Sequence, residues 1–271
     1  MVGWSLAHRG ILDDEAVREN MRVAILASAG KDSAYAAWWA TMRGWEVECL
    51  VTVCVSGDDS MMFQLNGTAV AALQAASMGV PWLPVMSLGE EESEVLELEA
   101  ALRGQSDIQS AFFESWPQTW DEPEQLEILM DVPDLDALVV GALRSDYQKT
   151  RIDRMCERLG IISYSPLWHH ESIEHMHALV DHGFDAHIAS VSTEGLDEDW
   201  LGRRVDDVSL AELEALAEKH RFNLDGEGGE FETIVLAAPH MHVRIECDAE
   251  SLWDGTRGVW NIESAVLTPM R

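Results

Sequence analysis

The chain has 271 residues, with 18 Lys and Arg against 49 Asp and Glu, which gives a formal net charge of −31 at pH 7. Hydrophobic residues make up 47% of the chain, enough for a sizeable core without disulfide or metal support. The charge balance argues against nucleic-acid binding through a broad basic face. No apolar run is long enough to cross a bilayer, and no signal-peptide pattern is present, so we expect a cytoplasmic protein.

The excess acid is spread along the whole chain, while lysine occurs only at Lys31, Lys149 and Lys219. This composition favours a halophilic protein, whose self-repulsion is screened in concentrated salt. The alternative is an acidic protein that binds a basic partner. The four cysteines form no C-x-x-C pair, which indicates reduced thiols and argues against a zinc or iron–sulfur site built on cysteine.

Residues 1–20 differ from the alternating pattern that follows them, and we treat them as an N-terminal extension. Met21 could be the true initiator, which would make the upstream residues a misassigned start. The other reading is a genuine short helix over residues 13–20. The sequence does not separate these two readings.

Strands and helices alternate from residue 21 onward. We expect strands at residues 21–27, 46–55, 82–86 and 136–141, helices at 33–44, 67–78, 90–103 and 147–159, and an irregular stretch at 104–133. The fourth strand is apolar throughout, as expected of a strand covered on both faces. This order predicts a parallel sheet with right-handed crossovers, and ligands in such sheets bind at the carboxyl ends of the strands. The loops after the first and fourth strands should therefore face one crevice.

The pattern changes after Pro166. Helices are expected at residues 173–182 and 210–220, and strands at 186–191, 232–237, 242–247 and 258–267. We therefore expect an α/β nucleotide domain at residues 21–166 and a smaller α+β domain at residues 167–271.

A short loop of small and charged residues follows the first predicted strand, and it comprises Ser28, Ala29, Gly30, Lys31, Asp32 and Ser33. The free N–H groups of a helix start attract anions, Lys31 adds a full charge, and Asp32 and Ser33 can cap the helix. A Walker loop is excluded, because Lys31 is followed by Asp32 and Ile25 stands where that motif needs glycine. The alternative is a simple strand-to-helix turn.

The loop resembles the pyrophosphate loop of enzymes that cleave ATP between its α and β phosphates. Two further stretches carry a more specific resemblance, namely residues 141–151 (GALRSDYQKTR) and residues 226–233 (GEGGEFET). Together with shorter matches at residues 62–64, 159–160, 166–168, 195–196 and 201–203, they resemble the diphthine–ammonia ligase (diphthamide synthase) family. The resemblance covers about residues 21–239.

The resemblance implies a Rossmann-like nucleotide domain of the HUP type followed by a smaller domain. It also implies ATP-dependent amidation of diphthine on translation elongation factor two, with Mg²⁺ and ammonium, releasing AMP and pyrophosphate. The alternative within the fold is a pyrophosphatase-loop enzyme that adenylates a tRNA base or a small carboxylate. The absence of paired cysteines and of a basic surface argues against a tRNA substrate. A non-enzymatic nucleotide sensor would need neither the glutamate–glycine loop nor a second domain.

The resemblance assigns candidate roles to three groups of residues. Nucleotide binding is expected of Ser28, Ala29, Gly30, Lys31, Asp32, Ser33, Gly141, Ser145, Gln148 and Arg151. A catalytic role is expected of Lys31, Asp146, Glu227 and Glu230, and Asp32 is the candidate Mg²⁺ ligand. The glutamates could hold ammonium, deprotonate it or ligate magnesium, and the alternative is an acidic turn. Asp146 could instead cap the helix at residues 147–159.

Two features lie outside these roles. The family usually has glycine where this chain has Ala29. The exchange would strain phosphate binding if this position needs a positive φ angle and would be neutral if it does not, and we expect it to be neutral because the surrounding residues match. The histidine-rich stretch contains His169, His170, His175, His177 and His182. It is expected to be a surface helix and linker, although a metal site is an alternative. Core or interdomain packing is expected of Trp38, Trp39, Trp45 and Trp168.

Overall fold

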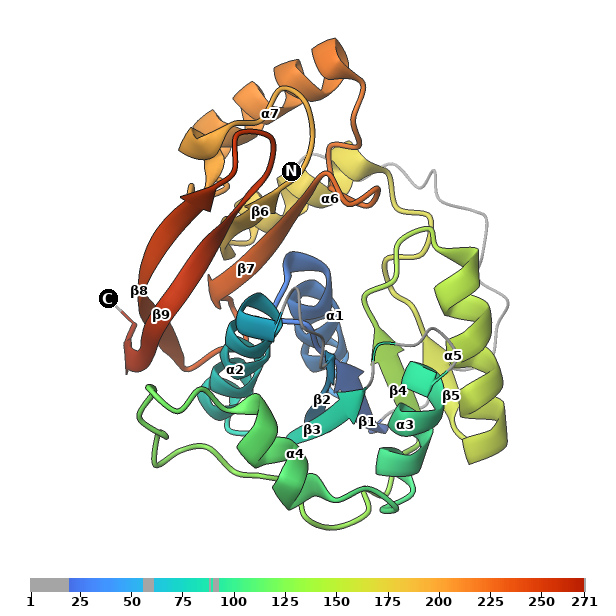
Figure 1. Ribbon diagram of the computed structural model, residues 1–271. Coiled ribbons are helices and arrows are strands. Elements are labelled where there is room, and N and C mark those ends of the chain that lie inside the picture. The colour runs from blue at the N-terminus through green and yellow to red at the C-terminus, as the bar shows by residue number, and fades with distance from the viewer. Residues whose placement is uncertain (1–19, 56–60, 88, 90–92, 271) are drawn as a thin grey trace.

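The computed structural model describes residues 20–55, 61–87, 89 and 93–270. Except for Asn20, the predicted N-terminal extension therefore lies outside the described residues. A parallel sheet flanked by helices forms one part of the molecule, and an antiparallel sheet with two helices on its outer side forms the other (Figure 1). This arrangement confirms the predicted α/β sheet with a smaller α+β part.

Five parallel strands form the first sheet in the order β3-β2-β1-β4-β5. They are β1 (Arg22–Leu26), β2 (Glu46–Val55), β3 (Trp82–Ser87), β4 (Ala137–Val140) and β5 (Ile162–Tyr164). Every residue of β4 is buried, because helices cover both faces of the sheet. The strand order reverses direction between β1 and β4, which opens a crevice at their carboxyl ends. The sequence analysis missed β5, whose three residues give too short a pattern.

Five helices accompany this sheet: α1 (Lys31–Met42), α2 (Met61–Met78), α3 (Ser93–Leu102), α4 (Ile108–Ser115) and α5 (Asp146–Leu159). Helix α4 corrects the expectation of irregular structure at residues 104–133. The side chain of Asp107 caps it by accepting a hydrogen bond from Ser110 N at 3.0 Å. Its eight residues are too few for a clear helical period.

The second sheet is antiparallel, in the order β7-β6-β9-β8. Its strands are β6 (Asp185–Val191), β7 (Phe231–Ala237), β8 (Val243–Trp253) and β9 (Gly258–Pro269). Helices α6 (Ser172–Asp181) and α7 (Asp207–His220) lie on its outer side, with a 3₁₀ turn, η1 (Glu198–Trp200), between them in the chain. The β8–β9 hairpin is longer than predicted. The prediction ended β8 too early because Asp248 and Glu250, which are exposed, interrupt the apolar pattern of the strand.

Helix α2 lies between the two sheets, packing on β2 of the first and on β8 and β9 of the second. Small side chains make this double contact feasible, because they let backbones approach from two sides. The fully or almost fully buried alanines of α2 are Ala69, Ala71, Ala72, Ala75 and Ala76. The two sheets therefore share one helix layer.

Aromatic side chains extend the contact between the two parts. Tyr35 stacks on Phe184 with ring centroids 5.8 Å apart, and Trp38 meets the same ring edge-on at 5.9 Å. Trp39 and Trp45 instead pack against each other within the first part, at 5.1 Å. Trp38 thus packs between the two parts, as the sequence analysis expected.

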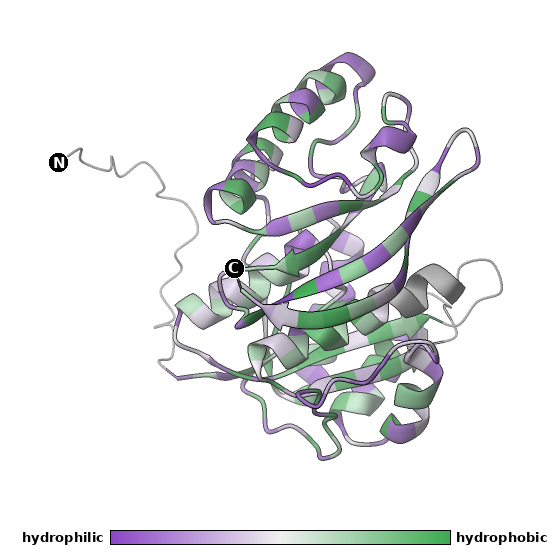
Figure 2. Cartoon of the chain, turned by 90° about the vertical axis from the view of Figure 1, so that its left-hand side faces the viewer, coloured by the Kyte–Doolittle hydropathy of each residue, from purple (hydrophilic) through white to green (hydrophobic). Residues whose placement is uncertain are grey.

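The strands of the antiparallel sheet show alternating hydrophilic and hydrophobic bands, while the parallel strands are mostly hydrophobic (Figure 2). This difference matches a sheet that is solvated on part of one face and a sheet that is covered on both. Within the described part of the chain, no helix is long and apolar enough to span a membrane.

Candidate functional site

A pocket of about 640 Å³ opens at the carboxyl ends of β1 and β4. Its lining joins segments that are distant in sequence: the loop after β1, the segment after β4, the facing sides of α3 and α5, and one residue of the second part. The sequence-predicted residues in this lining are Ser28, Asp32, Ser33, Gly141, Ser145, Gln148, Arg151 and Glu227. The expectation that the two loops face one crevice is confirmed.

The loop at residues 28–33 is closed by its own serines. Ser33 Oγ donates to the carbonyl oxygen of Gly30 at 3.0 Å and accepts from Ser28 N at 3.2 Å. Helix α1 begins at Lys31, and its N-cap, Gly30, provides no side-chain hydrogen bond. The predicted capping by Asp32 or Ser33 is therefore wrong, because both residues already lie in the first helical turn.

Ala29 corrects the expectation that its exchange for glycine leaves the loop backbone unstrained. Its φ angle is 65°, in the left-handed region that favours glycine. The conformation is held from outside the loop, since the Ala29 carbonyl accepts hydrogen bonds from Val235 N at 2.9 Å and Gln74 Nε2 at 3.0 Å. Alanine is therefore strained at this position, and strand β7 and helix α2 maintain the strain.

Gly141 allows the segment after β4 to pack closely against the start of α1. A Cβ atom at this position would lie 2.6 Å from the carbonyl carbon of Asp32 and 2.8 Å from Ser33 N. Such distances are shorter than any normal contact, so only glycine lets the end of β4 lie against the first turn of α1. The two halves of the predicted nucleotide site touch at this point.

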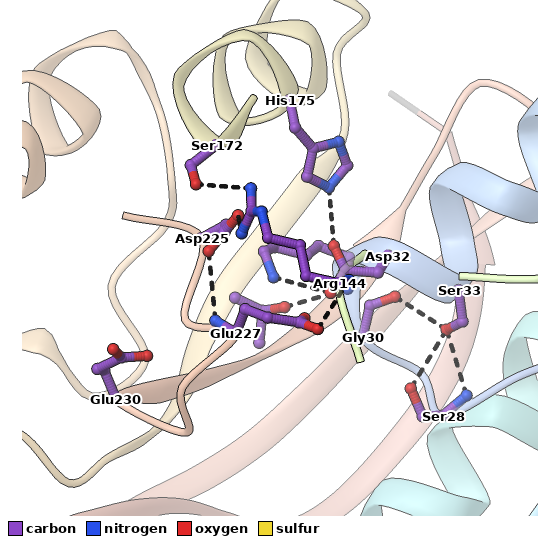
Figure 3. Close-up of polar contacts among 12 residues, drawn as sticks. Ser28, Gly30, Asp32, Ser33, Arg144, Ser172, His175, Asp225, Glu227 and Glu230 are labelled. Atoms are coloured by element: carbon purple, nitrogen blue, oxygen red, sulfur yellow. Dashed lines mark hydrogen bonds and ion pairs between the residues drawn. The ribbon is translucent and has the colours of Figure 1, made fainter. Parts of the chain in front are cut away.

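Lys31 and Asp32 form a partly buried ion pair at the start of α1. Lys31 Nζ lies 2.9 Å from Asp32 Oδ2, and the Lys31 side chain is only 7% exposed. The Asp32 side chain is 27% exposed and faces the pocket (Figure 3). Burial alone would raise the pKa of Asp32, but Lys31 and His175 outweigh it and hold that pKa below its ordinary value.

His175 is an exception on the expected surface helix, since α6 also carries exposed residues such as Glu174 and His177. The His175 side chain is fully buried on α6, and its Nε2 lies 2.7 Å from Asp32 Oδ1. Asp32 therefore has a partner on each oxygen, one from its own loop and one from the second part of the molecule (Figure 3). The described residues contain no group of three or more His, Cys, Asp or Glu side chains placed to hold a metal.

Glu227 reaches the pocket from the glutamate–glycine loop. One of its carboxylate oxygens accepts a hydrogen bond from Arg144 N at 3.2 Å, and its own N–H donates to Asp225 Oδ1 at 3.3 Å. Burial raises the pKa of Glu227, and the charges of Asp32 and Asp225 raise it further against the effect of the Arg144 N–H. This is the one carboxyl group of the loop that lines the pocket.

Arg144 and Asp225 brace this arrangement. Arg144 Nη1 lies 2.8 Å from Asp225 Oδ2, and the Asp225 side chain is completely buried. Arg144 Nη2 also donates to Ser172 Oγ at 2.9 Å and to the His170 carbonyl at 2.8 Å. Burial alone would raise the pKa of Asp225, but Ser172 and Arg144 hold it below its ordinary value. The segment after β4 is thus fixed to the second part of the molecule.

Three predicted catalytic residues, Lys31, Asp146 and Glu230, are not among the residues that line the pocket, and neither are the predicted nucleotide-binding residues Ala29 and Gly30. The Glu230 carboxylate accepts hydrogen bonds from Asn223 N at 2.9 Å and Gly228 N at 2.8 Å, so it stabilises its own loop, set apart from the other side chains (Figure 3). Asp146 is exposed in the first turn of α5 and is not among the lining residues. Ser145, rather than Asp146, caps that helix by accepting from Gln148 N at 3.3 Å.

Arg151, a predicted nucleotide-binding residue, lines the pocket. Its guanidinium lies 3.5 Å from the ring centroid of Tyr147, another lining residue. This distance is within the range of a cation–π contact. Arg151 and Lys149 are the cationic side chains of the lining, beside the carboxylates of Asp32, Glu94 and Glu227.

The sequence analysis missed three site residues, namely His175, Asp225 and Thr233. Thr233 Oγ1 accepts a hydrogen bond from Lys31 N at 3.1 Å, which fixes the start of α1 against β7. A signal for His175 was present, because it lies four residues before Leu179 and next to Met176 on the buried face of α6. Asp225 and Thr233 had no such signal, since they act through contacts distant in sequence.

Two family profiles match the chain. The profile described as the diphthamide synthase N-terminal domain matches residues 21–115 and 114–163, and the one described as the C-terminal domain matches residues 171–268. Both sheets of the structure are thus covered by one family.

Curated relatives carry the same description. The diphthine–ammonia ligase of Saccharomyces cerevisiae is 31% identical over 240 residues, covering 81% of this chain and 33% of the relative. That of Danio rerio is 30% identical over 241 residues, covering 84% of this chain and 87% of the relative. That of Homo sapiens is 28% identical over 242 residues, covering 86% and 85%. The chain therefore spans about a third of the length of the yeast relative but most of the vertebrate ones.

One solved structure, described as a predicted subunit of tRNA methyltransferase from Methanocaldococcus jannaschii, aligns with 81% of this chain and 98% of its own. Its TM-score of 0.35 and identity of 13% are too low to bear on function. The two profiles and the vertebrate relatives, by contrast, agree along almost the whole described chain. On this evidence, the chain is a member of the diphthamide synthase family.

Proposed function

We propose that the protein is an ATP-dependent, AMP-forming ligase that converts the diphthine carboxylate of translation elongation factor two to an amide. Residues 21–166 would bind ATP, and residues 167–271 would present the protein substrate. One observation carries the proposal: the 28–33 loop, the segment after β4 and Glu227 line one pocket. Family membership supplies the reaction class, because the relatives are named diphthine–ammonia ligases.

The pocket lining combines apolar and polar side chains, as a nucleotide site requires. Its apolar lining comprises Leu26, Val53, Val95, Leu98, Val140 and Ile152, which suits a purine base. The hydroxyls of Ser28 and Ser33 and the start of α1 suit phosphate oxygens. Its volume of about 640 Å³ falls in the range of small-molecule sites.

The proposed reaction has two steps. The substrate carboxylate attacks the α-phosphorus of ATP, the bond to the β-phosphate oxygen breaks, and pyrophosphate leaves. Ammonia then attacks the acyl carbon, AMP leaves with the bonding electron pair, and an amide remains. The start of α1 and Lys31 would stabilise the charge that builds up on the leaving pyrophosphate.

Glu227 is placed for the second step. Its raised pKa brings this carboxylate closer to neutral pH as a proton acceptor. It would hold ammonium in the pocket and take the proton that the attacking nitrogen loses. Glu230 cannot share this role in the present geometry, because its oxygens are engaged within its own loop.

Magnesium would enter with the nucleotide, since Mg²⁺ binds phosphates and water and needs only one or two carboxylates. Asp32 faces the pocket and could supply one, and its low pKa keeps it ionised. The donor set therefore fits an ion carried mainly by ATP. When bound, the ion would neutralise charge on the phosphates.

The experiment is an assay of the purified chain in concentrated salt with ATP, ammonium and the diphthine-bearing factor. The proposal expects AMP and pyrophosphate in equal amounts, together with a mass change that replaces a hydroxyl by an amino group on the factor. Release of ADP would contradict it. AMP release with small carboxylates but never with the factor would favour the alternative substrate class.

A further inference from the structure

His175 is a buried polar side chain whose imidazole has a single hydrogen-bond partner among the described residues. Its side chain is 0% exposed, and its Nε2 lies 2.7 Å from Asp32 Oδ1. Because the Asp32 carboxylate is ionised and can only accept, Nε2 carries the hydrogen and donates it. The other ring nitrogen, Nδ1, is buried without a hydrogen-bond partner among the described residues.

Packing alone gives a poor reason for histidine at this position. The neighbours of His175 on the buried face of α6 are Met176 and Leu179, and the ring of Tyr35 meets its imidazole edge-on at 5.2 Å. Burying a nitrogen without a partner is unfavourable, whereas leucine would fill similar space without that penalty. The contribution of His175 must therefore come through its bond to Asp32.

That bond completes the fixation of the Asp32 carboxylate. Lys31 holds Oδ2 at 2.9 Å and His175 holds Oδ1 at 2.7 Å, so the side chain has one orientation at the rim of the pocket. Lys31 is in turn fixed by the same carboxylate. Without His175, Asp32 could rotate, and both charged side chains of the loop would lose their orientation.

We propose that His175 is a positioning residue for nucleotide binding: it acts from the second part of the molecule, through Asp32, on the loop that binds ATP phosphates. The inference rests on the proposed function for its nucleotide, but it makes a separate claim about affinity. Helix α6 thereby becomes a part of the nucleotide site without touching the nucleotide.

The test measures ATP binding directly, by equilibrium dialysis in concentrated salt, without any protein substrate. His175→Leu removes the hydrogen bond and keeps the volume, and His175→Asn is polar but too short to reach Asp32. Both should weaken ATP binding about 10- to 100-fold, as expected for the loss of a hydrogen bond to a charged group. His175→Gln can place an amide N–H near the position of Nε2, and should stay within about threefold of the parent chain.

Two comparisons exclude a merely structural effect. His177→Leu, on the same helix but half exposed and paired with Glu214, should leave ATP affinity unchanged. When Asp32→Asn is already present, His175→Leu should lower ATP affinity little further, because the Asp32 carboxylate through which His175 acts has already been replaced. Circular dichroism at the same salt concentration verifies that each variant is folded.

Unchanged ATP affinity in folded His175→Leu or His175→Asn would overturn the inference. So would a His175→Gln variant as impaired as His175→Leu, because packing rather than the hydrogen bond would then be the cause. Failure of the amidation assay with normal ATP binding would count against the proposed function alone. If the parent chain bound no ATP, both would fall together.

Discussion

The carbonyl oxygen of Ala29 accepts a hydrogen bond from the backbone N–H of Val235 at 2.9 Å, although 206 positions separate these residues in the chain. A second bond, from Lys31 N to Thr233 Oγ1 at 3.1 Å, lies beside it. The loop of the first sheet is thus attached to β7 of the second. The shape of the candidate phosphate site therefore depends on both parts of the chain.

Substitutions at Ala29 test this attachment of the loop to β7. Its left-handed backbone costs roughly 1–2 kcal/mol relative to glycine, but glycine loses a buried methyl group and gains freedom in the unfolded chain. Ala29→Gly should therefore change the free energy of unfolding by less than about 1 kcal/mol. Ala29→Val should lower it by more than about 2 kcal/mol, since a β-branched residue resists this conformation in a fully buried position.

Urea unfolding in concentrated salt would measure both variants. A matched control is Ala189→Val in β6, where the backbone is extended and the side chain only partly buried. An Ala29→Val variant as stable as this control would show that residue 29 is not left-handed in solution.

The Arg144–Asp225 pair should support both stability and activity. Asp225→Asn leaves the Arg144 guanidinium without its charged partner, which should lower the free energy of unfolding by about 2–3 kcal/mol. The loss should be smaller than for a fully buried ion pair, because the Arg144 side chain is one-third exposed. The substitution should also loosen Glu227, whose N–H donates to Asp225, and slow amide formation. Asp134→Asn is the control, since that side chain is 79% exposed. Equal free energies of unfolding for Asp225→Asn and Asp134→Asn would contradict a stabilising role of the Arg144–Asp225 pair.

Lys31 should be essential for turnover. Lys31→Ala removes the charge expected to stabilise the leaving pyrophosphate, a change that should lower the rate about 100- to 1,000-fold. Asp32 keeps its partner His175, so the fold should persist. AMP release in concentrated salt measures the effect, with exposed Lys219→Ala as the control. Activity retained within a fewfold in Lys31→Ala would remove Lys31 from the phosphate site.

His240 should make stability depend on pH. Burial lowers its pKa from 6.5 to about 4, and the nearby His242 contributes to the shift. Between these values the unfolded chain binds a proton that the folded chain does not, so stability falls as the pH falls through this window. The loss should reach about 3 kcal/mol at the acid end.

His240→Asn should flatten that part of the stability–pH curve, measured by urea unfolding from pH 7 to pH 4. His169→Asn serves as the control, because His169 is exposed and its left-handed backbone suits asparagine. If both variants followed the parent curve, His240 would not be buried in its neutral form.

Local patterns explain why most of the fold could be predicted. The apolar run of β4 and the alternation of strands with helices specify a covered parallel sheet, whatever the distant contacts are. The misses occur where the local pattern is short, as in β5 and α4. The start of α1 was misplaced because Thr233, not a local cap, satisfies Lys31 N.

The candidate site also contains residues that local sequence could predict and residues that it could not. Contiguous strings pointed to Ser28, Ser33, Gly141 and Glu227, because each is close in sequence to a predicted strand. The spacing on α6 indicates that His175 is buried, but the contacts of His175 and Asp225 could not be predicted, since their partners Asp32 and Arg144 lie on the other part of the molecule. Glu230 was misassigned because composition does not distinguish a pocket carboxylate from one that closes its own loop.

In the proposed reaction, the substrate carboxylate becomes bonded to the α-phosphorus of ATP in the pocket. Heavy oxygen placed in the diphthine carboxylate of the factor tests this step in one measurement, the mass of the released AMP. One heavy oxygen should appear in each AMP, because the carboxylate oxygen stays with the phosphorus when ammonia displaces AMP. AMP without heavy oxygen, formed together with the amide, would contradict the acyl-adenylate and with it the proposed roles of the 28–33 loop.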